Sequence, residues 1–281
     1  MTSRAIALRL DRVSLNVADL PLATAFYVGA LGFEATPAVD ADPALAILLG
    51  VRTLRVVLLR RGRERLELAT FDPPGPPYPT DSRSDDLWFQ HCALVTDDIV
   101  AAYQRLSAFP FTPISRHGPQ RLPGGILAFK FRDPEGHPLE LIQFPRPDPR
   151  TTGGIDHSAI SVADAERSIA FYAARLGLSL QSRQINHGPA QEALDDLDGV
   201  AVDVVALASA KTAPHVELLE YRAPRGRPPL GTPPSSIAAS RLVFAVAALD
   251  RFDDAVALRD GAKACLIQDP DGHMLLLEQR R

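Results

Sequence analysis

An internal repeat is the feature that most constrains the fold of this chain. The stretch LDRVSLNVADLPLATAFYVGALGF at residues 10–33 returns as IDHSAISVADAERSIAFYAARLGL at residues 155–178, at a constant offset of 145 positions. Self-similarity at a fixed offset indicates repeated structural units. The sequence therefore predicts two similar halves. One exchange needs an explanation, because Arg12 of the first copy is His157 in the second.

Each copy begins with the pattern of a strand followed by a capped helix. RVSLNV and HSAISV are strand-like runs. Asp19 and Asp164 follow where an N-cap belongs, since their carboxylates can accept the free N–H groups of the first helical turn. Three β-rich runs are expected next in each copy. They are ALAILLG, LRVVLL and RLELATF in the first, and LSLQSR, VAVDVVALA and HVELLEY in the second.

A second unit with the same layout follows in each half. Residues 90–106 have the pattern of a strand, an Asp-capped turn and a helix, and residues 125–144 and 262–279 form matching hairpins. We therefore predict four βαβββ modules, of which the fourth is short by about one strand and its turn. The predicted domains are residues 8–145, with modules 8–72 and 87–145, and residues 153–281, with modules 153–222 and 238–281.

Composition and charge exclude several classes of protein. The chain has 281 residues, 46% of them hydrophobic, and a net charge of −4, so nothing favours nucleic acid or an anionic membrane as a partner. No apolar run approaches the ~18 residues of a membrane helix, and the N-terminus lacks the pattern of a signal peptide. Cys92 and Cys265 have no CxxC spacing. The cysteine usage therefore favours a cytoplasmic protein. Because the chain already contains four predicted modules, we expect a monomer or a homodimer.

The module pattern resembles that of the vicinal oxygen chelate superfamily. The resemblance rests on the βαβββ order, on the FY…LG helices and on the DPxGxxxE hairpin at residues 133–140, and it covers about residues 8–280. This family includes glyoxalase I, extradiol dioxygenases and bleomycin-binding proteins. The resemblance implies a small-molecule substrate and an α+β fold in which tandem domains form curved mixed sheets, or half-barrels. It also implies that each module offers up to two ligands to one divalent transition metal: nickel, zinc, iron, cobalt or manganese.

The family's ligand positions can be assigned residue by residue. The first-strand positions, usually histidine in the family, are Arg12, His91, His157 and Arg241. The last-strand positions, usually glutamate, are Glu67, Glu140, Glu217 and Leu276. Only modules two and three keep both donors. Within module three, the strand period places Glu217 on one face and Glu220 on the other. Glu278 shares a face with Leu276 and would be a donor only after a register slip.

Two pairings of the modules are open from the sequence. If modules pair in chain order, each cavity contains an arginine, and its permanent charge repels a dication and offers no lone pair. If module two pairs with three, one cavity gains His91, Glu140, His157 and Glu217. The other cavity would then keep Arg12 beside Glu67 and bind no metal. This crossed pairing resembles fused glyoxalases and gives a reason for the exchange of histidine for arginine.

The resemblance also implies a mechanism. Glu140 or Glu217, loosened from the metal, could move a proton on a substrate chelated through vicinal oxygens. We rank glyoxalase I-like lyase or isomerase chemistry first. The alternatives are an Fe(II) extradiol-type dioxygenase and a non-catalytic protein that binds an antibiotic or another small molecule. Arg116, Arg121 and Arg183 are candidates for binding an anionic group of the substrate at the cavity rim.

Overall fold

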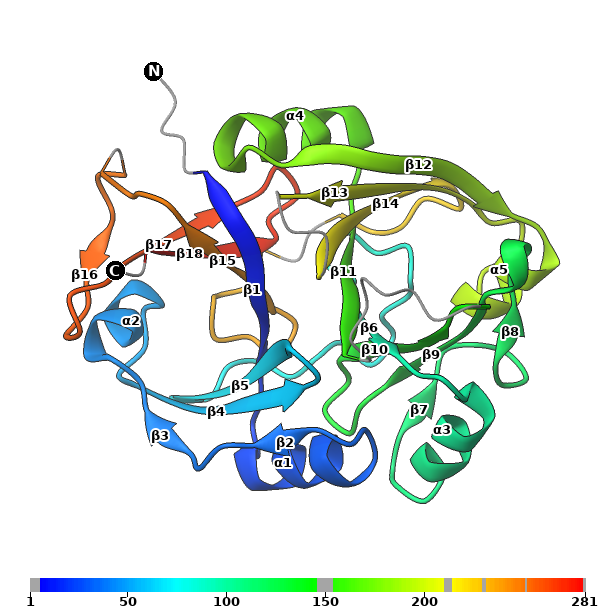
Figure 1. Cartoon of the computed structure of the whole chain (residues 1–281), viewed down its shortest axis with the longest axis horizontal. Coiled ribbons are helices and arrows are strands. Elements are labelled where there is room, and N and C mark those ends of the chain that lie inside the picture. The colour runs from blue at the N-terminus through cyan, green and yellow to red at the C-terminus, as the bar shows by residue number, and fades with distance from the viewer. Residues whose placement is uncertain (1–5, 146–153, 210–213, 229–230, 251, 280–281) are drawn as a thin grey trace.

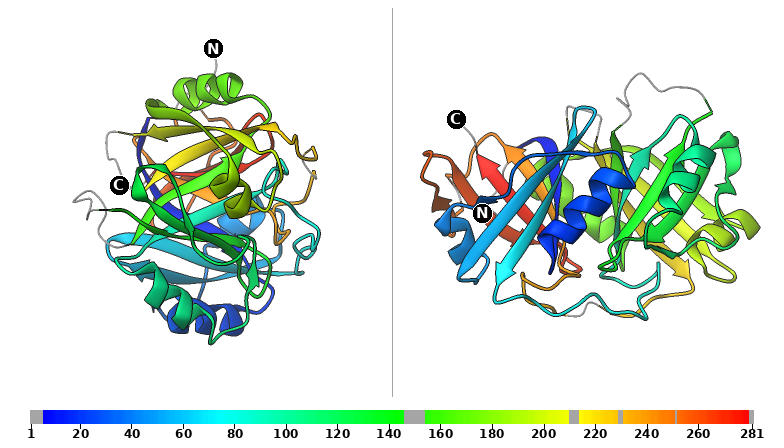
Figure 2. Two further views of the ribbon diagram at one scale, coloured as in Figure 1. Left: turned by 90° about the vertical axis from the view of Figure 1, so that its right-hand side faces the viewer. Right: turned by 90° about the horizontal axis from the view of Figure 1, so that it is seen from below.

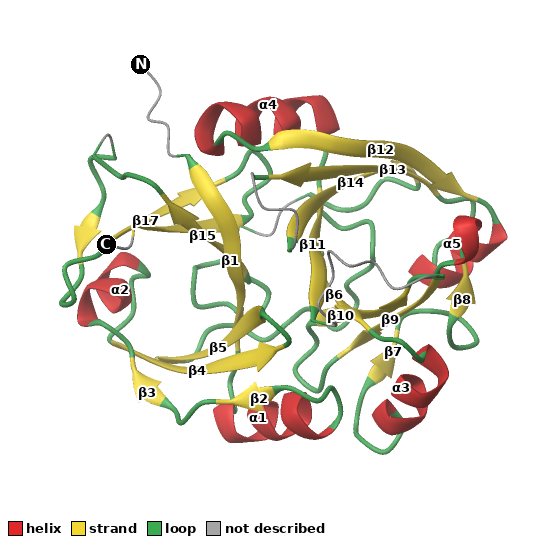
Figure 3. Cartoon of the chain, in the orientation of Figure 1, coloured by secondary structure: helices red, strands yellow, loops and turns green. Residues whose placement is uncertain are grey.

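The computed structural model describes residues 6–145, 154–209, 214–228, 231–250 and 252–279. It contains two nine-stranded mixed sheets, called sheet A and sheet B, which lie side by side (Figures 1 and 2). The longer helices lie on the outside of the sheets, and the short helices Pro43–Leu48 and Pro189–Asp195 lie at the open mouths of the sheets (Figure 3). Neither sheet closes into a barrel. The predicted α+β class with curved half-barrel sheets is confirmed.

Sheet A combines the first and fourth modules. Its strands, in spatial order, are β16 (Val256–Ala257), β17 (Lys263–Gln268), β18 (Met274–Gln279), β15 (Arg241–Val246), β1 (Ala7–Asn16), β5 (Glu64–Asp72), β4 (Thr53–Arg61) and β2 (Glu34–Ala35), and β3 (Val39–Asp40) also pairs with β4. The two modules meet where β1 pairs antiparallel with β15.

Sheet B combines the second and third modules in the same way. Its strands, in spatial order, are β12 (Ser179–His187), β13 (Ala201–Ala208), β14 (His215–Ala223), β11 (Ile155–Ser161), β6 (Gln90–Val95), β10 (Pro138–Gln143), β9 (Leu127–Arg132) and β7 (Thr112–Pro113), and β8 (Gln120–Arg121) also pairs with β9. The modules meet where β6 pairs antiparallel with β11. The pairing is therefore the crossed one, with two facing three and one facing four.

Short helices complete the modules. They are α1 (Leu20–Gly29), α2 (Pro43–Leu48), α3 (Ile99–Leu106), the 3₁₀ turn η1 (Pro123–Gly125), α4 (Ala165–Leu176) and α5 (Pro189–Asp195). The predicted caps are confirmed, because the Asp19 carboxylate accepts from the Leu22 N–H and the Asp164 carboxylate from the Arg167 N–H. Within the described residues, no helix is both long and apolar enough to cross a membrane.

Two local predictions were wrong. Residues 44–50 were expected to form a strand, but they lie in and just after helix α2, which begins with an Asp42 N-cap and Pro43 in its first turn. The fourth module lacks its helix rather than a strand. Its described part passes from β15 to the two-residue β16 without one and still supplies β17 and β18. The loss is tolerated because sheet pairing does not depend on the covering helix.

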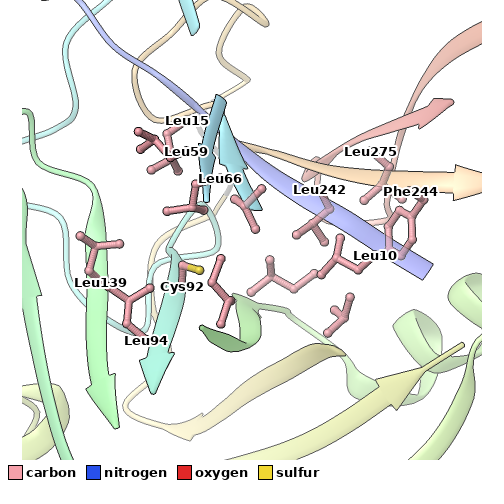
Figure 4. Packing of buried hydrophobic residues seen from close by; sticks show 14 of the residues in the cluster. Leu10, Leu15, Leu59, Leu66, Cys92, Leu94, Leu139, Leu242, Phe244 and Leu275 are labelled. Atoms are coloured by element: carbon pink, nitrogen blue, oxygen red, sulfur yellow. The ribbon is translucent and has the colours of Figure 1, made fainter. Parts of the chain in front are cut away.

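The main hydrophobic core takes side chains from both sheets. Leu10, Leu66 and Leu242 of sheet A belong to the same cluster as Cys92 and Leu139 of sheet B (Figure 4). Cys92 is 2% exposed, as expected for a small apolar residue. Since side chains alternate along a strand, His91 must point to the opposite face. The division into domains at residues 145 and 153 stays a prediction, and the connector 146–153 lies outside the described residues.

Candidate metal centre

Two histidines come together where the second and third modules meet. His91 lies on β6 and His157 on β11, and the register places His157 opposite Ala93 and Ala159 opposite His91. The two imidazoles are therefore diagonal neighbours on one face of sheet B, with ring centroids 5.5 Å apart. Both residues are almost fully buried, at 2% and 4% exposed.

Two glutamates approach this pair from the flanking strands. Glu140 lies on β10 and Glu217 on β14, and each strand runs parallel to the histidine strand of its own module. The Oε2 atom of Glu140 is 2.8 Å from His91 Nε2 and 3.8 Å from His157 Nε2. Glu217 Oε2 is 3.5 Å from His157 Nε2. The structure thus gathers all four sequence-predicted donors.

A fifth residue orients His157. Its Nδ1 lies 2.9 Å from the Asp156 carboxylate. Neighbours on a strand normally face opposite sides, but the ladder is irregular between Ile155 and His157, at a β-bulge. Bulges re-aim side chains next to functional sites. The arrangement matches the carboxylate–histidine pair that supports a metal ligand from behind and leaves Nε2 aimed at the cluster.

The residues fit a metal ion. Donor atoms that are about 2 Å from a shared ion lie roughly 3 Å from one another. His91, Glu140 and His157 each offer an atom, and these atoms all lie within 4.8 Å of one another. Nε2 of His91 and Nε2 of His157 face the Glu140 carboxylate at 2.8 Å and 3.8 Å, but neither contact has the geometry of a hydrogen bond in the described structure. Buried polar atoms usually have a partner of good geometry, and a cation between the two Nε2 atoms and the carboxylate would supply one.

The two imidazoles have different pKa shifts. Burial and the nearby Lys130 lower the pKa of His91, so its ring stays neutral with lone pairs available. Burial also opposes protonation of His157, but the Glu217 and Asp156 carboxylates outweigh it and raise the pKa of His157 well above its ordinary value. A metal must therefore displace a proton from His157 before it can bind Nε2.

The two glutamates remain ionised. Burial alone would raise the pKa of Glu140, but the His157 and His91 rings outweigh it and hold that pKa well below the usual range. The same balance, with His157 and His215 as the partners, brings the pKa of Glu217 to about 2. Both carboxylates are therefore available to a cation at neutral pH.

Two further residues of the site were not assigned to it from the sequence. His215 is the first residue of β14, and its Nε2 is 3.3 Å from Glu217 Oε1. Lys130 lies directly opposite Glu140 on β9 and is 3% exposed. Both could have been found from the sequence, because His215 precedes Glu217 by two positions and Lys130 follows from the register of the hairpin.

The competing glutamates are placed by the register. Glu220 points away from the cluster and accepts a hydrogen bond from the Ala165 N–H at the start of α4. Glu278 belongs to sheet A, and its carboxylate receives two hydrogen bonds from Arg12. Neither residue reaches the cluster of sheet B.

The three arginines proposed for the rim do not line the cavity. Arg116 pairs with Asp196 and Asp198. Arg183 pairs with Asp203 on the neighbouring strand, whereas the cavity receives Gln184 of β12. Arg121 is exposed and only its neighbour Leu122 lines the cavity. Their role in binding substrate stays a prediction without support from this placement.

The equivalent position in sheet A contains an ion-pair network in place of the metal donors. Arg12 Nε lies 2.9 Å from Glu67 and its NH2 lies 2.7 Å from Glu278. Its NH1 donates to Asp11 at 3.1 Å. The arginine therefore uses the carboxylates that a cation would otherwise take.

Helix α2 covers the same face of sheet A with apolar side chains. Leu45 and Leu48 of α2 pack against a cluster that includes Val243 and Leu276. Leu276 occupies the position that Glu140 holds in sheet B, since it pairs with Val243 as Glu140 pairs with Ala93. In the described part of sheet A, arginines therefore replace both histidines, leucine replaces one glutamate, and apolar side chains of α2 pack over this face.

Sheet B instead has a cavity of about 130 Å³ at the cluster. Its polar lining includes His91, Lys130, Glu140, Asp156, His157, Gln184, Asn186, Gln191, Glu217 and Tyr221. Its apolar lining includes Leu122, Ile126, Ile142, Phe144, Leu194, Val202, Val204 and Leu219. Pockets for drug-sized ligands measure roughly 300–1,000 Å³. The cavity therefore suits the reacting part of a small molecule.

Comparison with known proteins agrees with this architecture. The sequence matches the Glyoxalase/Bleomycin resistance protein/Dioxygenase superfamily over residues 9–141 and again over 154–277. A search of curated proteins finds no match. Glyoxalase I from Zea mays is similar with a TM-score of 0.67 and 17% identity, over 96% of this chain and 92% of that one. A "putative dioxygenase" from Bacillus subtilis is similar with a TM-score of 0.57 and 13% identity, over 99% and 86%. At these identities the likeness shows the fold.

Proposed function

Since the chain belongs to the Glyoxalase/Bleomycin resistance protein/Dioxygenase superfamily, we propose that the cavity of sheet B holds one divalent transition metal. The ligands are His91, Glu140, His157 and Glu217. The observation that carries this proposal is the convergence of two buried imidazole Nε2 atoms and two ionised carboxylates, with contacts of 2.8–3.8 Å that lack good hydrogen-bond geometry. The proposed reaction is a glyoxalase I-like isomerisation or lyase step on a small substrate with two neighbouring oxygens.

The residues of the cavity would have different roles in this reaction. The metal supplies a Lewis acid that polarises a substrate carbonyl. Glu217 is the base that accepts a proton from the carbon next to the carbonyl and returns it to the other carbon. It suits this role because it lies outside the tight group of His91, Glu140 and His157, and His215 is near enough to orient its carboxylate. The apolar wall limits the access of water.

An iron-dependent dioxygenase is the second candidate. The tight group consists of two histidines and one glutamate, which is the ligand set of non-haem Fe(II) oxygenases. In this case Glu217 would not bind the metal, and more positions would be open for oxygen and substrate. A protein that only binds a small molecule in this cavity is the third candidate, because the same fold could bind a ligand without a reaction.

The first test is the metal content of protein purified without a metal-affinity tag. The proposal expects about one equivalent of nickel, zinc, iron, cobalt or manganese per chain.

The loaded protein is then incubated with α-hydroxycarbonyl compounds in D₂O, and exchange at carbon is followed by NMR. Exchange that is lost in Glu217→Gln supports the isomerase. Oxygen consumption by the iron form with catechols, without exchange, supports the dioxygenase. If the protein binds no metal, the isomerase and the dioxygenase are both ruled out, and the protein that only binds a small molecule becomes the first candidate.

A further inference from the structure

Lys130 is the feature of the cavity that the proposed metal chemistry does not use. Among the described residues that line the cavity it is the only lysine or arginine. Its side chain is 4% exposed. Burying an ammonium group costs free energy unless its N–H groups donate hydrogen bonds. A buried lysine at this position therefore indicates a functional or structural role.

The Lys130 ammonium is held in place by one hydrogen bond, and its other N–H donors have no partner in the part of the chain that the structure describes. In the described structure Lys130 Nζ donates to the Asp195 carboxylate at 2.6 Å and to no other atom. The other oxygen of that carboxylate accepts from Gln191 at 2.7 Å. The backbone carbonyl of Asp195 accepts from the Ser84 hydroxyl at 2.9 Å. An ammonium group has three protons, so Lys130 keeps two donors beside the cavity.

The other sheet offers an internal comparison. Lys130 is paired across the β9–β10 hairpin with Glu140, and the equivalent pair in the β17–β18 hairpin is Leu266 with Leu276. The lysine is therefore found in the sheet that has the histidines, and leucine occupies the equivalent position in the sheet that has arginines instead. The Glu140 and Glu217 carboxylates act on the ammonium as well as Asp195 does, so Lys130 belongs to the charge balance of the donor cluster and is not a separate salt bridge.

We propose that Lys130 binds a carboxylate of the substrate, and that the substrate is a small acid whose carboxylate adjoins the hydroxyl-and-carbonyl pair on which the proposed reaction acts, as in a 3-hydroxy-2-oxo acid. The inference rests on the proposed metal site, because the neighbouring oxygens are those that the metal would take. A charge-assisted hydrogen bond from the ammonium fixes the carboxylate beside the cluster. The outer wall contributes the amides of Gln184 and Asn186, which suit neutral polar groups.

The test compares two ligands that differ in charge and little in size, glycolate and glycolamide. The protein is loaded with Co²⁺, whose visible spectrum reports a change of ligands. The wild type is expected to bind glycolate more tightly than glycolamide. In Lys130→Met combined with Asp195→Asn, which leaves no unpaired buried carboxylate, glycolate affinity should fall roughly 10-fold to 100-fold. Affinity for glycolamide should stay the same.

Lys263→Met is the matched control, because it removes the same charge from an exposed pair with Asp250 on sheet A. It should keep the preference for glycolate. No preference in the wild type overturns the role of Lys130, whether or not the double variant folds. A preference of unchanged size in the double variant overturns it as well. If Co²⁺ does not bind to the wild type, the proposed metal site is wrong. This result is obtained before any ligand is added and is therefore distinct from a failure of the Lys130 proposal.

Discussion

Replacing Glu217 by glutamine tests whether the site has four ligands or three. Glu217 holds a carboxylate oxygen 3.5 Å from His157 Nε2, and glutamine keeps its size while removing the charge. Loss of an outer-shell partner lowers metal affinity 10-fold to 100-fold, so loss of a charged ligand should lower it by at least about 100-fold, or ~2.7 kcal/mol. Affinity is measured by calorimetric titration of the metal-free protein with Co²⁺ against a competing chelator.

Glu67→Gln is the matched control from sheet A. Glu67 pairs with Ser14 across β1 and β5 as Glu217 pairs with Ala159 across β11 and β14. It accepts a 2.9 Å hydrogen bond from Arg12, and a hydrogen bond to a charged group contributes about 1.5–3 kcal/mol. The control should lose about that much free energy of unfolding in urea and keep its metal affinity. The reasoning is refuted if Glu67→Gln weakens metal binding. A change below about threefold in Glu217→Gln would refute the four-ligand site.

Three further predictions concern the same two sheets. Because a proton must leave His157, whose pKa is raised, Co²⁺ affinity should rise with pH by up to about tenfold per unit below that pKa, as titrations at several pH values would show; a flat profile would contradict it. Asp156→Ala should lower metal affinity about 10-fold to 100-fold in the same calorimetric assay, because His157 loses its orienting carboxylate. Arg12→Met should cost about 3–5 kcal/mol in urea unfolding, because buried carboxylates lose their partner, while an unchanged midpoint would show that the network is dispensable.

The fold was predictable from the sequence because repeats and periodicity are local signals. The alternation in HSAISV predicts a strand and Asp164 predicts the start of a helix, because both signals depend only on neighbouring residues. Together they mark the beginning of a module. The segment 44–50 misled the interpretation because a short apolar run fits a strand and a helix equally well. Asp42 followed by Pro43 was the signal that would have decided it.

The site was predictable only in part. The positions of His91 and Glu217 follow from the family resemblance, and the chemistry of arginine favoured the crossed pairing but left both pairings open. Asp156 was not predictable, because a β-bulge breaks the alternation that would place it on the opposite face from His157. Lys130 depends on the register of a hairpin whose turn has to be known first. Contacts between modules are long-range, and no local pattern encodes them.

The two sheets have equivalent positions that carry a cluster of possible metal ligands in sheet B and an ion-pair network in sheet A. In sheet B, buried imidazole nitrogens are left for a cation, and a cation bound there would add to the stability of the folded state. In sheet A, the guanidinium of Arg12 stands where His157 stands in sheet B and pairs with Glu67 and Glu278, so these carboxylates are neutralised by a side chain. Because each sheet takes one module from each half of the chain, a fused chain can change the donors of one sheet without changing those of the other. Two identical subunits could not do this, since every substitution would appear in both sites. Under the proposed function, Arg12 and His157 at equivalent positions give the two sheets different roles, with the metal chemistry in sheet B and an ion-pair network that stabilises sheet A.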